Sequence, residues 1–214
     1  MYFEYGEKET DYLAAKDKKL GEAILKIGHV RRKVDEDLFA AVTHQIIGQQ
    51  ISTAALATLW DRLNDRIGKV DAEGILSLGR EQLQDVGMSY RKAEYILDFA
   101  EKVKSGAFDV EALEQMPDDA VVLELTSLKG VGVWTAEMVM IFCMQRPDVV
   151  SFGDLAILRG MRMLYRHRAL DRAKFDKYRK RYSPYGSVAS LYLWEIAGGA
   201  LEGVTDPAPK KGKK

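Results

Sequence analysis

The chain has 214 residues, of which 47% are hydrophobic and 30% charged, so it can bury a sizeable core in one domain or two small lobes. Its formal net charge is zero, which argues against a uniformly basic surface for nucleic acid. No apolar run approaches the length of a membrane span, and the acidic start MYFEYGEKETDY is unlike a signal peptide. We expect an intracellular protein, located in the cytoplasm or nucleoid of a prokaryote or in the nucleus of a eukaryote.

Cysteine and histidine usage narrows the chemistry further. Cys143 is the single cysteine, which excludes a disulfide within the monomer and an iron–sulfur cluster held by four cysteines. His29, His44 and His167 lie far apart and lack the spacing of a zinc site. The sequence therefore implies no transition metal.

Apolar residues recur at helical spacing along most of the chain, and alternation with a period of two is nearly absent. The pattern predicts an all-α fold. In chain order, the predicted helices cover residues 37–66, 90–103, 120–126, 133–144, 155–165 and 187–197.

Charge is segregated along the sequence. Residues 109–124 hold six acids and no base, whereas residues 159–182 hold ten Lys or Arg against two Asp. The basic run is typical either of a DNA-facing surface or of a solvated helix face. Residues 206–214, which end in KKGKK, are predicted to form a disordered basic tail that adds nonspecific attraction to phosphate.

The stretch LKGVGVWTA at 128–136 is the most informative motif of the chain. Gly130 and Gly132 permit positive φ and place no side chain between the backbone and a ligand, so the following helix presents its N–H groups and positive dipole end. A backbone phosphate of DNA is the natural ligand of such a turn. A helical hairpin with a glycine C-cap has the same pattern, and the motif alone leaves both interpretations open.

Several separated segments together resemble one known family. The run 128–136 resembles the hairpin of the helix-hairpin-helix DNA glycosylases, and Asp154 in SFGDLAIL stands where that superfamily carries its catalytic aspartate. Three more segments are similar to its alkylpurine (3-methyladenine) branch: HQIIGQQISTAA at 44–55, GMSYRKAEYI at 87–96 and SPYGSVASLYLW at 183–194. The resemblance covers about residues 35–200.

The resemblance implies an all-α fold of two lobes with a DNA-binding cleft between them. Residues 1–34 and 146–205 would form the terminal lobe, and residues 35–145 the central lobe, with the helix-hairpin-helix at about 120–144. It also implies an enzyme that binds duplex DNA containing alkylated bases, flips the damaged nucleotide and hydrolyses the N-glycosidic bond in base excision repair. A search of duplex DNA for lesions needs only one protein molecule, so we predict a monomer.

Asp154 is the expected catalytic residue. An alkylated purine is a cationic leaving group, so one carboxylate can suffice, by stabilising the oxocarbenium-like sugar and positioning or deprotonating the attacking water. Helix N-capping ahead of Leu155 is the alternative role, and one carboxylate can do both. Relatives that also nick the strand carry a Schiff-base lysine at the position of Trp134, which cannot form an imine, so no lyase activity is expected.

A flipped base needs an aromatic or apolar pocket, which the resemblance assigns to Trp134, Met138 and Trp194. A cationic methylpurine over an indole face gains roughly 0.5–2 kcal/mol of cation–π energy that a neutral purine does not. Either tryptophan could instead belong to the core.

DNA contacts are predicted in the hairpin and in two of the other matched segments. Val86 or Met88 would be the wedge that fills the space left by the flipped nucleotide. Gln49 and Gln50 would touch the orphaned base or form hydrogen bonds within the lobe. The full set is Lys129, Gly130, Val131, Gly132, Thr135, Gln49, Gln50, Ser52, Val86, Gly87, Met88, Ser89 and Lys92.

No cofactor is expected to be required, although the resemblance implies a Na or K ion on the backbone carbonyls of Thr126, Leu128 and Val131 that would assist DNA binding. Two other functions remain open. A noncatalytic helix-hairpin-helix DNA-binding module would have no use for Asp154 or the two tryptophans. A glycosylase for deaminated bases such as uracil is disfavoured because no obvious acid lies near the motif.

Overall fold

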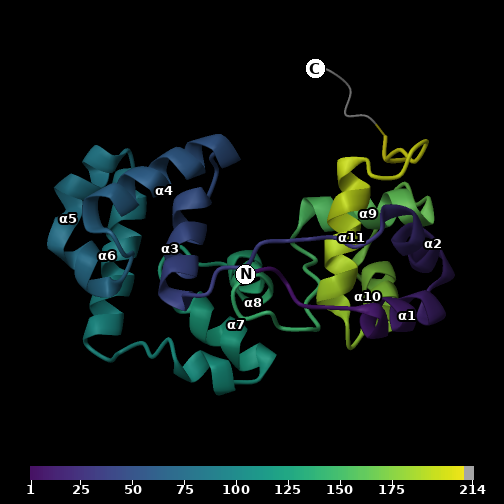
Figure 1. Cartoon of the computed structure of the whole chain (residues 1–214), viewed down its shortest axis with the longest axis horizontal. Coiled ribbons are helices and arrows are strands. Elements are labelled where there is room, and N and C mark those ends of the chain that lie inside the picture. The colour runs from purple at the N-terminus through teal and green to yellow at the C-terminus, as the bar shows by residue number, and fades with distance from the viewer. Residues whose placement is uncertain (210–214) are drawn as a thin grey trace. The chain divides into compact units, whose positions relative to one another are not determined.

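The computed structural model describes residues 1–209, and the chain divides into two compact units (Figure 1). Unit 1 joins Met1–Val34 to Gln145–Lys214, and unit 2 is Asp35–Met144. The described residues are helical apart from turns, loops and an isolated antiparallel bridge between Tyr2 and Lys33. No helix among residues 1–209 is long and apolar enough to cross a membrane.

Unit 1 contains five of the helices. They are α1 (Glu7–Lys16), α2 (Lys18–Ile27), α9 (Leu155–Tyr165), α10 (Arg172–Tyr182) and α11 (Gly186–Gly198). The core is organised around α11, which packs against α9, α2, α1 and α10 and is buried at every position from Gly186 to Leu193. A helix that is buried all round needs an apolar or small residue at nearly every position, which SVASLYL provides.

The contact between α9 and α11 is close because of one glycine. A Cβ added at Gly160 would overlap the backbone carbonyl of Leu193 in α11. Only a residue without a side chain permits the two backbones to approach in this way. Gly160 therefore fixes the distance between the helix that begins after Asp154 and the helix that carries Trp194.

Unit 2 contains α3 (Leu38–Gly48), α4 (Thr53–Ile67), α5 (Ala72–Val86), α6 (Tyr90–Lys104), the 3₁₀ helix η1 (Ala112–Gln115), α7 (Asp118–Thr126) and α8 (Val133–Phe142). The apolar helix α8 packs against α7 and α3, and α3 packs in turn against α4 and α6. Ile46, Leu63, Ile96, Leu125 and Ile141 are completely buried in this core. The hairpin between α7 and α8 is therefore attached to a rigid base.

The prediction of a single helix over residues 37–66 is wrong, because two helices, α3 and α4, cover this stretch. The chain leaves α3 after Gly48, Gln50 adopts a positive φ of 58°, and Ser52 starts α4 as an N-cap whose Oγ accepts the Ala55 N–H at 3.2 Å. A serine N-cap starts a new helix in a sequence whose apolar spacing continues through the break. The helix predicted over residues 155–165 is confirmed, whereas α1, α2, α5 and α10 were not predicted.

Two boundaries differ from those predicted. Gln145, which was assigned to the central lobe, belongs to unit 1, where its Oε1 accepts the N–H of Glu4 at 2.8 Å. Asp206, which was assigned to the disordered tail, is bound through both carboxylate oxygens by the Arg162 guanidinium, at 3.0 and 2.5 Å. The basic end of that predicted tail, KKGKK at residues 210–214, lies outside the described residues.

Candidate active site and DNA-binding surface

Asp154 is the N-cap of α9 and is only 7% exposed. Its Oδ1 accepts the backbone N–H groups of Ala156 at 2.8 Å and Ile157 at 2.9 Å. The same oxygen accepts the indole N–H of Trp194 at 3.2 Å. The predicted capping role is confirmed, and the third donor comes from α11, forty residues further along the chain.

The start of α9 surrounds the Asp154 carboxylate with hydrogen-bond donors. Two backbone N–H groups and the positive end of the α9 dipole favour negative charge at this position. Leu155, the next residue, is 81% exposed, so the helix start lies at the surface although the carboxylate itself is shielded. A shielded, fixed negative charge can stabilise a developing cation more strongly than an exposed mobile one.

Trp194 is half-buried and forms a hydrogen bond to the carboxylate, which gives it a positioning role that the sequence did not indicate. Trp134, the second residue of α8, is 41% exposed, and its neighbour Val133 is 56% exposed. Trp134 is therefore not a core residue. Met138 is only 3% exposed because it lies on the buried side of α8, so the structure does not present it to a base as predicted.

Only the first of the two hairpin glycines adopts the positive φ that glycine permits, because Gly132 has an ordinary extended backbone with φ −97°. Gly130 adopts φ +80°, and Gly132 is the N-cap of α8 and supplies no side-chain cap. The side chains of Val131 and Thr135 are buried at 6% and 4% exposure, so the hydroxyl of Thr135 does not face DNA as predicted. Gly130, Gly132 and Val133 are exposed residues of the turn.

Three supports from unit 2 hold this turn. The Gln49 side-chain amide donates to the Gly130 carbonyl at 2.7 Å. The ring of Tyr95 lies directly against Gly130, where an added Cβ would overlap it. Lys129 Nζ lies 2.6 Å from Asp98 Oδ1. Tyr95 and Asp98 are not among the predicted site residues, although Tyr95 lies one helical turn after Lys92 within the matched segment at 87–96.

The Lys129–Asp98 pair alters the pKa values of both groups. The hydrogen bond from Lys129, followed by that from Lys102, lowers the pKa of the Asp98 carboxyl. The hydrogen bond to Asp98 raises the pKa of Lys129. Lys129 forms this ion pair within unit 2 while its side chain remains 56% exposed, and its contact with a phosphate stays a prediction.

Lys92 also has an internal role. Its Nζ donates to the carbonyls of Ile47 and Gln49, both at 2.7 Å, where α3 ends. Burial lowers the pKa of Lys92, as expected for an ammonium group withdrawn from water. Lys92 therefore holds the end of α3 beside the hairpin, and its contact with DNA stays a prediction.

A groove of about 460 Å³ lies in unit 2 where the matched segments meet. It brings together Gln50 and Gln49 after α3, Ser89 and Lys92 at the start of α6, and Gly130 of the hairpin, with Arg91 and Tyr95 completing its lining. Ser52 and Ser89 are the exposed N-caps of α4 and α6. Three segments far apart in sequence thus form one polar surface with helix starts on it.

The predicted wedge is wrong. Val86 is 1% exposed and Met88 is 4% exposed, because both side chains turn into the core on either side of Gly87. Gly87 itself is exposed and ends α5 with φ +114°. The exposed large side chain beside this turn is Tyr90, at 52%, which lies against the Arg80 guanidinium.

The basic run at 159–182 is partly neutralised within unit 1. Five of its side chains form ion pairs: Arg162 with Asp206, Arg172 with Asp176, Lys174 with Asp171, Arg179 with Asp148 and Arg181 with Asp17. Three of these pairs, those of Arg162, Arg179 and Arg181, join α9 or α10 to distant segments, and the other two lie on the exposed face of α10. Exposed basic residues of the run include Arg159, Arg168, Lys177 and Lys180.

The carbonyls implied for a monovalent cation fit that role in part. They lie at and just after the C-terminal end of α7, where the helix dipole favours positive charge. Leu128 O accepts the Val131 N–H at 3.1 Å and retains a second lone pair. The residues that would hold the ion are Thr126, Leu128 and Val131.

A family model described as "HhH-GPD superfamily base excision DNA repair protein" matches residues 43–184, which include the hairpin, the groove and Asp154. The chain belongs to this superfamily. The prediction from the separated motifs is confirmed, and the all-α fold is that of HhH-GPD proteins.

Similar proteins carry related names. A solved structure of a DNA-3-methyladenine glycosidase from Bacillus halodurans has 34% sequence identity and a TM-score of 0.84, with 93% of each chain covered. A Schizosaccharomyces pombe 3-methyladenine DNA glycosylase, solved in complex with abasic DNA, has 25% identity and a TM-score of 0.77 over 88% of this chain and 95% of that one. A DNA-3-methyladenine glycosylase from Bacillus subtilis is 25% identical to this chain over 75% of this chain's length. The matched region covers 57% of the length of that relative.

Proposed function

We propose that this HhH-GPD protein is a monofunctional DNA glycosylase that releases alkylated purines, of the 3-methyladenine and 7-methylguanine type, from duplex DNA in base excision repair. The observation that carries the proposal is the shielded Asp154 carboxylate, held by the start of α9 and by Trp194. The relatives named for 3-methyladenine support the substrate class.

The proposed mechanism begins with binding of the DNA backbone by the hairpin amides and the helix starts at Ser52 and Ser89. The damaged nucleotide rotates out of the duplex, and the exposed indole of Trp134 offers its face to the cationic base. As the N-glycosidic bond breaks, the bond electrons leave with the base, and Asp154 stabilises the cationic sugar. Water then attacks C1′, and its proton passes to Asp154 or to solvent.

Absence of lyase activity is part of the proposal. A lyase needs an amine nucleophile that attacks the sugar. By the family resemblance, Trp134 stands at the position where the lyases of the family carry that lysine. Lys129, the nearest lysine in sequence, is bound to Asp98, and its pKa is raised, which disfavours the neutral amine. The product is therefore an intact abasic site.

The chain is proposed to act as a monomer on double-stranded DNA inside the cell, without a required cofactor. A Na or K ion on the carbonyls of Thr126, Leu128 and Val131 would supply positive charge between the hairpin and a phosphate. Such an ion would affect DNA affinity and leave bond cleavage to Asp154.

The test is release of free 3-methyladenine and 7-methylguanine from methylated duplex DNA by wild type and by Asp154→Asn, with binding to an abasic duplex measured in parallel. Asparagine is a good N-cap without negative charge, so the variant should fold and bind DNA but release base at least about a hundredfold more slowly. Strands should break only after alkali. Equal release by both proteins would refute the catalytic role of Asp154, and binding without release by either would indicate a noncatalytic module or another lesion.

A further inference from the structure

We propose that Asp148 and Ser187 are positioning residues that hold the loop leading to Asp154 against α11, and so set the orientation of the Asp154 carboxylate. The inference rests on the proposed function, because it concerns the residue that would stabilise the sugar cation. All of the residues involved lie in unit 1.

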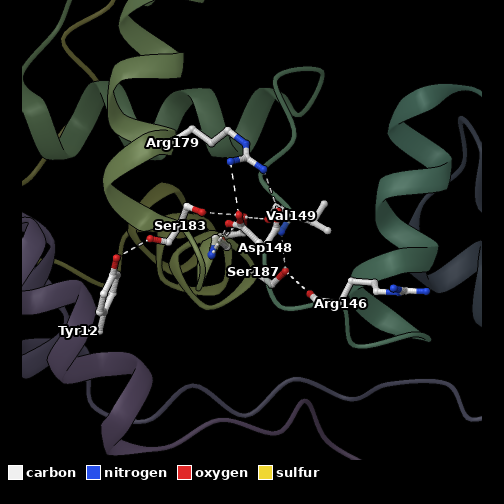
Figure 2. A network of polar contacts seen from close by, with 9 residues as sticks. Tyr12, Arg146, Asp148, Val149, Arg179, Ser183 and Ser187 are labelled. Carbon is white, nitrogen blue, oxygen red and sulfur yellow. Dashed lines mark hydrogen bonds and ion pairs between the residues drawn. The ribbon is translucent and has the colours of Figure 1, made fainter. Parts of the chain in front are cut away.

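The loop from residue 146 to residue 153 has no helical hydrogen bonds of its own, and it is bound instead to the first turns of α11 (Figure 2). Ser187 accepts the Val149 N–H at 3.0 Å through Oγ and donates the same hydroxyl to the Arg146 carbonyl at 2.5 Å. Its backbone N–H donates to the Pro147 carbonyl at 2.9 Å. One buried serine thus satisfies three backbone groups of the loop.

Asp148 forms the second attachment. Its carboxylate accepts the Ser183 hydroxyl at 2.6 Å and the Gly186 N–H at 3.1 Å, and Arg179 lies against it with NH1 at 3.6 Å from Oδ2. Arg179 also donates to the Asp148 carbonyl at 3.0 Å. Figure 2 shows Arg179 of α10 and Ser183 of the turn after it converging on Asp148.

Asp148 takes the place of a helix cap. The N-cap residue of α11, Tyr185, makes no side-chain cap bond, and the carboxylate of Asp148 receives the first N–H of the helix from a distant part of the chain. A Cβ at Gly186 would lie 2.6 Å from Asp148 Oδ1, so the glycine is what lets the carboxylate approach. These contacts fix the position of the first turn of α11 relative to the loop.

The position of α11 affects Asp154 because α11 also carries Trp194. Trp194 follows Ser187 by seven residues, which is about two helical turns, and its indole N–H reaches Asp154 Oδ1. Asp154 itself follows Asp148 by six residues in the clamped loop. The carboxylate is therefore fixed from two sides, by the loop that leads into α9 and by α11, and Asp148 with Ser187 joins the two.

A purely structural network would have different consequences. Loss of an anchor that only stabilised unit 1 would lower stability without acting through Asp154. Loss of a positioning anchor would slow base release, because small misplacements of a catalytic group can cost up to about a hundredfold in rate. It would leave binding to an abasic duplex nearly unchanged, because the hairpin and the groove belong to unit 2.

The experiment measures single-turnover release of 3-methyladenine and abasic-duplex Kd for Asp148→Ala, Asp148→Asn and Ser187→Ala. We expect Asp148→Ala and Ser187→Ala to slow release by about tenfold or more, with Kd within about threefold of wild type. Asp148→Asn retains an acceptor for the Gly186 N–H and should recover most of the rate. The matched control is Asp176→Ala, which removes an exposed α10 carboxylate paired with Arg172.

The decisive comparison places Asp148→Ala in the Asp154→Asn background. If Asp148 acts through Asp154, the double variant releases base no more slowly than Asp154→Asn alone. A further tenfold loss in the double variant, or a wild-type rate for folded Asp148→Ala, would overturn the inference. If Asp148→Ala fails to fold, Ser187→Ala carries the same comparison. Lack of release by wild type would refute the proposed function itself, which keeps the two failures distinct.

Discussion

At the residue scale, one carboxylate combines a structural and a proposed chemical role. Asp154 caps α9 with two backbone hydrogen bonds and also holds the Trp194 indole through the same oxygen. An N-cap residue needs only a side-chain hydrogen-bond acceptor, whereas stabilisation of a cationic sugar requires negative charge. The two roles therefore separate on substitution.

Asp154→Ala should lower the free energy of unfolding by about 1 kcal/mol or more through loss of the cap, whereas Asp154→Asn should lower it by less than about half as much. Both variants should lose base release. Urea unfolding followed by circular dichroism gives the first quantity and the methylpurine assay gives the second. Equal stability of the two variants would show that the cap contributes little.

At the scale of elements, the packing of α9 on α11 depends on Gly160, which meets the Leu193 carbonyl. Gly160→Ala should destabilise the protein by roughly 1–3 kcal/mol, because a backbone atom cannot turn aside as a flexible side chain can. Gly198→Ala, at the end of α11 with no atom within 4 Å of the added Cβ, is the matched control and should be neutral or slightly stabilising. Thermal unfolding of both variants tests this prediction. Similar losses of stability in the two variants would mean that stability does not depend on the close approach of α9 and α11.

The hairpin is joined to α6 by an ion pair that makes its attachment depend on pH. Because the pKa of Asp98 is lowered in the folded chain, its stabilising effect is present above the unfolded value of about 3.9 and is lost as pH falls through the lowered value. The difference in free energy of unfolding between wild type and Asp98→Asn should therefore be largest near pH 6 and should disappear as the pH is lowered. Lys129→Gln should reduce that difference, and a difference unchanged down to pH 2 would contradict the assignment.

At the scale of the whole molecule, DNA affinity cannot come from net charge, which is zero. It must come from local arrangements, namely helix starts and exposed basic side chains on a few surfaces. Ion pairs within the chain already engage five of the ten basic residues of the run at 159–182. The end of the sequence, KKGKK at residues 210–214, carries four further positive charges.

Deletion of residues 210–214, which contain four lysines, should weaken binding to undamaged duplex and reduce the slope of log Kd against log salt by about 0.9 for each phosphate no longer neutralised. Single-turnover base release at saturating DNA should not change, because Asp154 and Trp194 are untouched. A variant with the four lysines replaced by Gln controls for length. An unchanged salt slope would show that these lysines do not meet phosphate.

Local rules were sufficient for some elements and insufficient for others. The bounds of α9, the cap at Asp154 and the glycine turn of the hairpin follow from neighbouring residues, and the family follows from motifs whose order is visible in the chain. The break between α3 and α4 was missed because helical apolar spacing continues through it, although Ser52 was available as a cap.

Which side chains serve DNA and which serve the fold was decided by tertiary packing. Val86 and Met88 flank an exposed glycine and could have pointed outward, yet the packing of α5 and α6 buries both. Lys92, Lys129 and Asp148 have charges that suit either a ligand or a partner within the chain, and residues 31 to 45 positions away supply those partners. Helix starts are set by hydrogen bonds over a few residues, whereas the partner of a charged side chain depends on which distant segments the core brings together.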